Sequence, residues 1–199
     1  MRKALILTVA LVAASLVLSF SGAALAEGDL DRDIYLSAGY GVFIPAGDFY
    51  KPISGNDWEN GADVNFSIVS QQSDIFAVGL DLHYYDTEVN FPAGIITVHV
   101  TGLEPMQMLQ RKDADFQPYG GIGAGFYFNT LQGVSGPGIV NDIYKGVGPL
   151  IKGGARYFLG DKFFIGGHLK MFSNESDMDD GSTFDFGGTS MNLEVGVAF

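Results

Sequence analysis

The sequence predicts an all-β protein, an eight-stranded antiparallel up-and-down transmembrane β-barrel. Three observations predict this fold. Eight segments alternate between an apolar face and a small or polar face, and the connections between them alternate in length. Glycine supplies 28 of the 199 residues, about twice its average usage of about 7%. Beyond the N-terminal segment, no stretch has the roughly twenty consecutive apolar residues that a membrane helix needs, so a membrane-embedded chain must cross with strands.

The N-terminus has the order of a secretory signal peptide: two basic residues, an apolar run from Ala4 to Phe20, and an Ala-x-Ala site that ends at Ala26. We expect residues 1–26 to be a cleaved signal peptide and residues 27–199 to form the barrel domain; the alternative is an uncleaved anchor helix. The mature chain would hold nine basic and 23 acidic residues, a net charge of −14 that repels nucleic acid. The absence of cysteine excludes disulfides and thiolate metal sites.

The first three expected strands alternate without interruption, over residues 33–44, 61–69 and 76–85. Residues between the apolar ones, such as Gly39, Asp63 and His83, are small or polar. The apolar faces comprise Ile34, Leu36, Ala38, Tyr40 and Val42, then Ala62, Val64, Phe66 and Ile68, then Phe76, Val78, Leu80, Leu82 and Tyr84.

The fourth expected strand, about residues 95–111, is irregular. Ile96, Val98 and Val100 alternate with polar residues, but the same count puts Glu104 on the apolar face. We therefore expect a β-bulge near Gly102 that switches the register. Pro105 would suit such an irregular position.

The last four expected strands cover residues 116–128, 147–159, 163–172 and 189–199. The fifth is rich in glycine, which predicts a thin wall facing bulky interior groups. A dinucleotide-binding loop is excluded there, because the third glycine of that motif is missing and no helix follows. In the eighth strand, Met191, Leu193, Val195, Val197 and Phe199 share one apolar face.

The connections support the barrel. Residues 45–60, 86–94, 129–145 and 173–187 form long connections, whereas residues 70–75, 112–115 and 160–162 form short ones. Long extracellular loops, short periplasmic turns and two periplasmic termini are the pattern of a bacterial membrane barrel.

Alternation alone does not say which face points outward, so a soluble lipocalin-like barrel is the alternative. Its polar face would meet water and should carry many Lys, Glu and Thr residues. Here that face is rich in glycine with few charges, as the crowded interior of a narrow barrel requires. Aromatic residues near the strand ends fit interfacial girdles: Tyr84, Phe116, Phe126, Phe128, Tyr157, Phe163 and Phe199.

The C-terminal strand resembles the last strand of Gram-negative outer-membrane β-barrels, which ends on an aromatic residue. With its eight strands and the segment from Gln117 to Phe126, the chain looks like the group of small barrels that includes the OmpA transmembrane domain, OmpX and OmpW. The resemblance implies location in the outer membrane, contact with its lipid and lipopolysaccharide, and insertion by the barrel-assembly machinery. It also implies that Phe199, Val197 and Val195 form the assembly signal.

The polar faces collect charges that an eight-stranded barrel must neutralise in its interior, because only side chains fit there. If the turn at residues 160–162 sets the register, Arg156 lies near Gly166, and Lys152 lies near Lys170. We expect carboxylates to separate the two lysines. The expected lumen network comprises Asp63, Asp81, His83, Lys152, Arg156, His168, Lys170 and Glu194, with His99 on the same faces.

The residues favour neither catalysis nor a cofactor. His168 and Ser173 are five residues apart and point to opposite faces of a regular strand, and the His-x-Ser-Asn pattern of lipid A deacylases is absent. The acidic loop from Glu175 to Asp185 does not have the spacing of an EF-hand. It could still bind divalent cations weakly, bridging to lipopolysaccharide phosphates, although a merely solvated loop is the simpler interpretation.

We therefore expect a non-enzymatic outer-membrane barrel with a structural or surface-interaction role and a packed polar lumen. The resemblance to OmpW suggests an alternative, a porin-like passage for small hydrophobic molecules that leave through the wall. A lipid A-modifying enzyme and a soluble lipocalin-like binder are further alternatives. A passage predicts an apolar cavity among Phe43, Tyr85, Tyr127 and Phe172, whereas a plug predicts that these side chains pack together.

Overall fold

The protein is described by a computed structural model that covers residues 32–51, 55–92, 94–112, 114–135, 138–178 and 181–199. The expected signal peptide, residues 1–26, lies outside the described residues. The elements are β1 (Ile34–Pro45), the 3-10 helix η1 (Asp48–Tyr50), β2 (Gly61–Gln71), β3 (Phe76–Phe91), β4 (Gly94–Gln110), β5 (Phe116–Ser135), β6 (Gly138–Leu159), β7 (Phe163–Phe172), β8 (Glu175–Asp177), β9 (Thr183–Asp185) and β10 (Gly188–Ala198). Among the described residues, no helix is long and apolar enough to cross a membrane.

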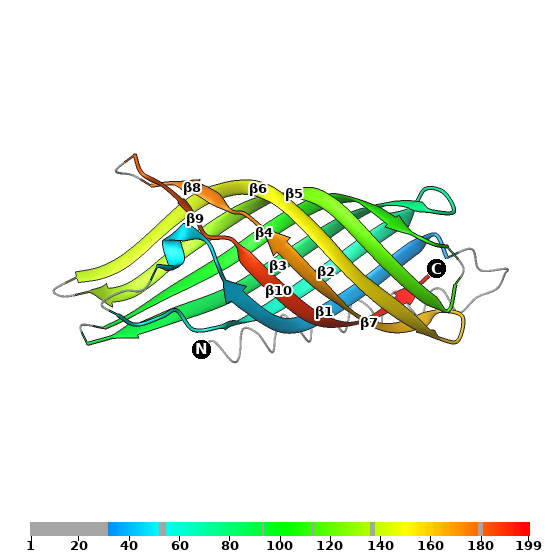
Figure 1. The fold of residues 1–199 in the computed structure, drawn as a ribbon, viewed down its shortest axis with the longest axis horizontal. Coiled ribbons are helices and arrows are strands. Elements are labelled where there is room, and N and C mark those ends of the chain that lie inside the picture. Colours follow the sequence, from blue (N-terminus) through cyan, green and yellow to red (C-terminus); the bar gives the residue numbers. More distant parts are fainter. Residues whose placement is uncertain (1–31, 52–54, 93, 113, 136–137, 179–180) are drawn as a thin grey trace.

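Eight of these strands close into the predicted antiparallel barrel (Figure 1). Neighbours in sequence pair from β1 to β7, β10 pairs with β7, and β1 closes the barrel against β10, with Tyr35 opposite Ala198. Closure leaves no open sheet edge, which is what a strand structure in lipid requires. The small strands β8 and β9 form a hairpin within the β7–β10 connection, and β8 pairs with β6.

The barrel has two distinct ends (Figure 1). The terminus end carries the C-terminus and the short connections between β2 and β3, between β4 and β5, and between β6 and β7. The loop end carries η1 and the β8–β9 hairpin. Two connections predicted as long loops, residues 86–94 and 129–145, are instead strand pairs: β3 and β4 remain paired to Phe91 and Gly94, and β5 and β6 to Ser135 and Gly138. The loop prediction was wrong there because the β3–β4 and β5–β6 ladders continue past the ends predicted for these strands.

The bulge predicted near Gly102 is wrong. The β3–β4 ladder keeps one register from Phe76 opposite Leu109 to Phe91 opposite Gly94. The β4–β5 ladder keeps its register too, and skips only Glu104 and Pro105, as expected where proline lacks an N–H group. Consequently Val98, Val100 and Glu104 all point inward.

Because β4 has no bulge, His99 lies on a different face from the one predicted. The sequence placed this residue with the interior charges, but it lies on the outer face of β4, half-buried. Its Nδ1 atom is 3.1 Å from the Tyr84 hydroxyl oxygen of the neighbouring strand. His99 is therefore not part of the lumen network.

Apart from Ile96, Val98 and Val100 of β4, which lie toward the interior, the residues of the predicted apolar faces lie on the outer wall. Ile68, Ile122 and Val195 are all more than half exposed. Exposed aromatic side chains include Phe116 and Phe163, the first residues of β5 and β7 at the terminus end, and Phe128 within β5, toward the loop end. A wall of this kind matches the lipid-facing surface of a membrane barrel.

Candidate functional site

The barrel interior holds the predicted charged side chains, and it divides into two parts. The ionic layer comprises Asp63, Asp81, His83, Glu104, Lys152, Arg156, His168, Lys170 and Glu194. The aromatic layer, nearer the loop end, comprises Phe43, Tyr85, Tyr127 and Phe172. All thirteen side chains are buried.

The two lysines of the ionic layer stand opposite each other, as the turn at residues 160–162 predicts. Lys152 is the cross-strand partner of Lys170, and Arg156 is the partner of Gly166. Each ammonium group reaches a different carboxylate: Lys152 Nζ lies 2.7 Å from Asp81 Oδ2, and Lys170 Nζ lies 2.6 Å from Glu104 Oε2. Repulsion between the lysines is thus offset by two separate ion pairs.

His83 connects two carboxylates. Its Nε2 atom is 2.6 Å from Asp63 Oδ2, and its Nδ1 atom is 3.2 Å from Glu104 Oε1. An imidazole can donate through both nitrogens only as the imidazolium. With His83 charged, four cations (His83, Lys152, Arg156 and Lys170) balance the four carboxylates of the layer (Asp63, Asp81, Glu104 and Glu194). Such pairing is the condition for burying charge.

In the part of the ionic layer nearer the terminus end, several side chains contact Glu194. Its Oε1 atom accepts hydrogen bonds from Arg156 Nε at 3.2 Å and from the Tyr119 hydroxyl at 3.0 Å. The Arg156 guanidinium also lies 4.4 Å from the centre of the Tyr119 ring and donates to Gln110 Oε1 at 2.9 Å. His168 Nδ1 approaches Glu194 Oε2 at 3.7 Å, which is too long for a hydrogen bond.

A serine, a histidine and an aspartate meet in the ionic layer, but not in a nucleophilic arrangement. Ser190 Oγ donates to Asp63 Oδ2 and lies 3.3 Å from His83 Nε2. In a catalytic triad the acid contacts one imidazole nitrogen and the nucleophile donates its proton to the other. Glu104 does contact His83 Nδ1, but the Ser190 hydroxyl donates to Asp63, and the same carboxylate also contacts His83 Nε2. His168, the histidine considered for catalysis from the sequence, lies opposite Asn192 of β10. The described residues contain no cluster of three or more metal-ligating side chains.

The aromatic layer is tightly packed. The Phe43 and Tyr85 rings stack with centroids 3.8 Å apart, and Phe172 lies 5.5 Å from Tyr127 and 5.8 Å from Phe43. The two layers are joined by the Tyr127 hydroxyl, which donates to Glu104 Oε1 at 3.1 Å. Gly125 and Gly102 provide the room for Tyr127, since a Cβ atom at either position would collide with its ring.

The loops cover the aromatic layer. Tyr50 of η1 and Tyr85 of β3 both donate to the Phe186 carbonyl oxygen, at 3.1 and 2.5 Å. Burial raises the pKa of Tyr50, so its hydroxyl remains a donor. Around them pack Phe49, Trp58 and Phe186, with the Phe49 and Phe186 ring centroids 4.1 Å apart.

Two parts of the interior escaped sequence analysis. Glu104 was left out of the expected network, and charge balance gave no signal for it, because the three expected carboxylates already matched two lysines and an arginine. A buried amide cluster at the loop end was also missed: Asn129 Nδ2 donates to Ser176 Oγ at 2.6 Å, and Asn174 Nδ2 donates to Asn129 Oδ1 at 2.7 Å. These residues fall in segments expected to be loops, so no periodicity marked them.

Comparisons with known proteins agree with this geometry. No family model and no curated protein matches the sequence. The fold is similar to Neisserial surface protein A (NspA), with a TM-score of 0.60 and 11% identity over 83% of this chain and 97% of that one. It is also similar to Ail, the attachment invasion locus protein of Yersinia pestis, solved with the heparin analogue sucrose octasulfate: the TM-score is 0.56, with 16% identity over 85% of this chain and all of Ail. The chain thus has the fold of small eight-stranded outer-membrane barrels.

Proposed function

We propose that the protein is an integral outer-membrane β-barrel, not an enzyme, with a structural or surface-interaction role and a lumen closed by the ionic and aromatic layers. The observation that carries this proposal is the ionic layer: its four carboxylates and four cations pair within an interior bounded by an apolar outer wall. Buried charges that pair in this way favour one closed arrangement of the lumen. The loops then remain the place for interaction.

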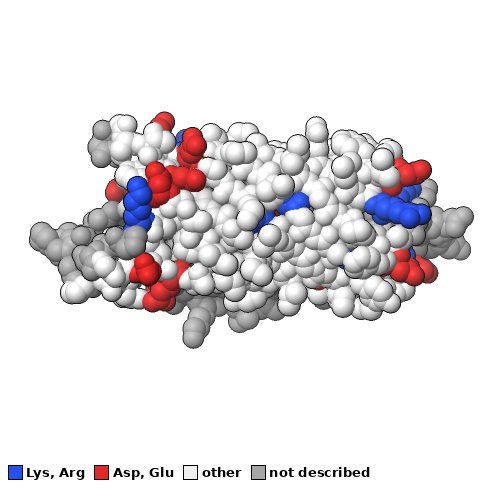
Figure 2. Space-filling model, viewed as in Figure 1, with Lys and Arg blue, Asp and Glu red and all other residues white. Residues whose placement is uncertain are grey.

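The charge at the loop end limits the kinds of ligand that could bind there. Figure 2 shows carboxylates gathered at the loop end and mixed charges at the terminus end, with almost no charge on the wall between. Among the described residues near or beyond the loop end, two lysines (Lys51 and Lys145) face nine acids: Asp48, Asp57, Glu59, Asp86, Glu88, Asp142, Glu175, Asp177 and Asp185. Such a surface disfavours polyanions of the heparin type. A ligand like the one in the Ail structure is therefore not expected.

The membrane location is tested by heat-modifiability. Outer-membrane fractions are compared on gels with and without boiling in detergent. We expect the unboiled protein to migrate as a compact band and the boiled protein to shift. A protein found in the soluble periplasm without a shift would contradict the proposal and favour a lipocalin-like binder.

A passage for small hydrophobic molecules is the second candidate. A shallow hollow of about 460 Å³ opens on the outer wall toward the loop end, and its lining includes Leu150, Phe172, Gly187 and Gly188. A molecule leaving the lumen there would have to displace Phe172, which packs against Phe43 and Tyr127. If the passage exists, Phe172→Ala should increase uptake of a small hydrophobic dye by cells; equal uptake would count against it.

We further propose that Phe199, Val197 and Val195 form the assembly signal. Val195 and Val197 lie in β10, which closes the barrel against β1 with Leu36 opposite Val197, and Phe199 directly follows this strand. Phe199→Ala should lower the outer-membrane level several-fold and leave the protein as a substrate for periplasmic proteases. Immunoblots of membrane fractions measure this, with Tyr40→Ala, at an exposed aromatic residue of β1, as the control. Normal levels of Phe199→Ala would refute the assignment.

A further inference from the structure

A hollow of about 830 Å³ interrupts the apolar outer wall across β3 to β7. Here Gly120 and Gly153 lie side by side on the outer face as cross-strand partners. A Cβ atom at Gly120 would meet nothing nearer than the Lys152 carbonyl oxygen at 3.9 Å, and one at Gly153 nothing nearer than the Tyr119 carbonyl oxygen at 4.0 Å. The floor of the hollow is therefore bare backbone with space above it.

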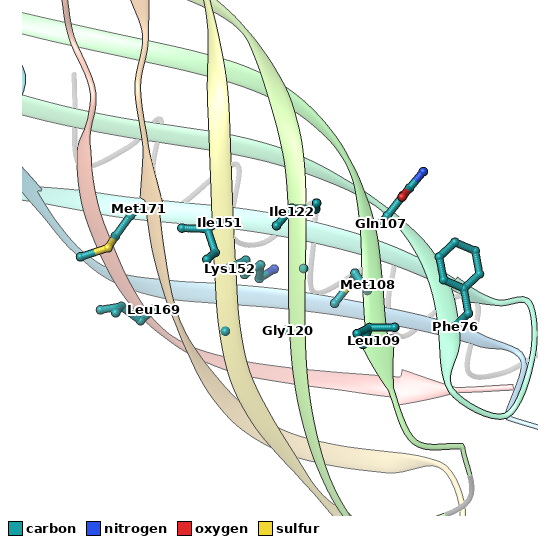
Figure 3. A pocket seen from close by; sticks show the side chains of 12 residues that line it. Phe76, Gln107, Met108, Leu109, Gly120, Ile122, Ile151, Lys152, Leu169 and Met171 are labelled. Atoms are coloured by element: carbon teal, nitrogen blue, oxygen red, sulfur yellow. The ribbon is translucent and has the colours of Figure 1, made fainter.

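The rim of the hollow is apolar and elongated. Figure 3 shows its side chains in a row from Phe76, beside the β2–β3 turn, across to Met171 of β7. Ile122 and Ile151 stand on either side of the two glycines, and both are more than half exposed. Cavities of about 300–1,000 Å³ hold small organic ligands, so this hollow is large enough for a flexible hydrocarbon chain.

One polar side chain stands at the edge of the hollow nearest the terminus end. Gln107 projects outward from β4, next to Phe76 and Leu109 (Figure 3). Its amide forms no hydrogen bond with the described part of the chain. A polar group on a lipid-facing wall is costly unless a partner satisfies it, and the ester and phosphate oxygens of a lipid headgroup are suitable acceptors for its N–H groups.

We propose that this hollow binds one phospholipid, with an acyl chain over Gly120 and Gly153 and the headgroup region near Gln107. The proposal rests on the outer-membrane location and on the orientation in which the terminus end is periplasmic. In that orientation Gln107 and Phe76 face the inner leaflet, which consists of phospholipid.

A second copy of the chain fits the hollow less well. In a two-fold symmetric dimer, a patch on the axis meets its own copy, and two facing hollows leave a void between them. Lipopolysaccharide is the other rival. Its acyl chains would have to enter from the loop end, through the smaller hollow, which shares Ile151 and Met171 with this one.

The test is native mass spectrometry of the full chain, extracted from membranes in mild detergent. The wild type should retain one phospholipid per barrel. The double variant Gly120→Leu/Gly153→Leu fills the hollow and should retain about tenfold less or lower still, because the leucines displace several methylene groups. The matched control, Ala38→Leu/Ala124→Leu, places two leucines on the outer face at positions outside the hollow and should retain phospholipid like the wild type.

Two further variants keep the test decisive. Gln107→Leu removes only the amide and should lower retention about threefold. If the double variant does not assemble, Gly120→Ala takes its place. It fills less of the hollow and should lower phospholipid retention by an intermediate amount. Equal retention in the filled and control variants, retained lipopolysaccharide instead of phospholipid, or a dimer mass would each overturn the proposal. A wild type without a heat-modifiable band would instead contradict the membrane location, so the two failures are distinguishable.

Discussion

The ionic layer and the aromatic layer fill the same barrel by different physical rules. In the ionic layer each charged group has specific partners, such as Lys170 with Glu104 and Lys152 with Asp81. In the aromatic layer Phe43, Tyr85 and Phe172 contact one another through ring surfaces. A paired charge cannot be replaced by a neutral group of equal size without stranding its partner, whereas an apolar side chain can be replaced by one of similar volume. The ionic layer therefore tolerates a substitution only if each charge keeps its partner, and the aromatic layer tolerates one that keeps the side-chain volume.

The largest effect is expected at Glu104, which contacts Lys170, His83 and Tyr127. Glu104→Gln keeps the size of the side chain but strands the Lys170 and His83 charges, so the free energy of unfolding should fall by about 3–5 kcal/mol. Urea unfolding in lipid vesicles, followed by gel mobility, measures this change. The control Glu175→Gln, at an exposed position of β8, should change stability by less than about 0.5 kcal/mol.

A double variant tests whether the loss at Glu104 comes from the unpaired charge of Lys170. If the loss at Glu104 comes from the stranded ammonium group, Glu104→Gln/Lys170→Met should be more stable than the sum of the two single losses predicts, by about 1–3 kcal/mol. Strictly additive losses would show that Glu104 and Lys170 are not coupled. The ionic layer would then not differ from the aromatic layer in depending on specific partners.

In the aromatic layer the effect should depend on volume. Phe172→Ala leaves a cavity beside Phe43, Tyr85 and Tyr127 and should lower the free energy of unfolding by about 3 kcal/mol. Phe172→Met refills the space with a flexible apolar side chain and should lose less than about 1.5 kcal/mol. The same urea titration distinguishes them, and equal losses for the two variants would contradict the volume rule.

The smallest effect is expected outside the lumen. Lys112 Nζ lies 2.9 Å from Asp33 Oδ1 at the terminus end, and the Asp33 side chain is about half exposed. Lys112→Ala should change the free energy of unfolding by less than about 0.5 kcal/mol, because water screens such a pair. A loss as large as that of Glu104→Gln would mean that burial does not explain the strength of the ionic layer.

The strands and most of the ionic layer could be predicted from the sequence because alternation with period two decides which residues share a face. The short turn at residues 160–162 fixed the opposition of Lys152 and Lys170 as well. Glu104 could not be placed on the interior. It shares a face of β4 with Val98 and Val100, and alternation assigns such an apolar face to the outer wall, whereas in the structure it lines the interior. Near the aromatic layer the interior is itself apolar, so hydrophobicity no longer separates inside from outside.

The loop end was the least predictable part. Turn signals and polar residues mark segments 86–94 and 129–145 as loops, yet pairing between neighbouring strands extends the barrel through them. The amide cluster of Asn129 and Asn174 joins residues 45 positions apart, a contact that exists only once β5, β7 and β8 are in place. Local sequence carries no signal for such a contact.

The central claim, that the two layers close the lumen, is tested most directly by ion conductance of the purified barrel in planar lipid bilayers. The account predicts no stepwise conductance for the wild type, and transient conductance only when Glu104→Gln is combined with Phe172→Ala, which weakens both layers. Stable conductance steps from the wild-type barrel would contradict it.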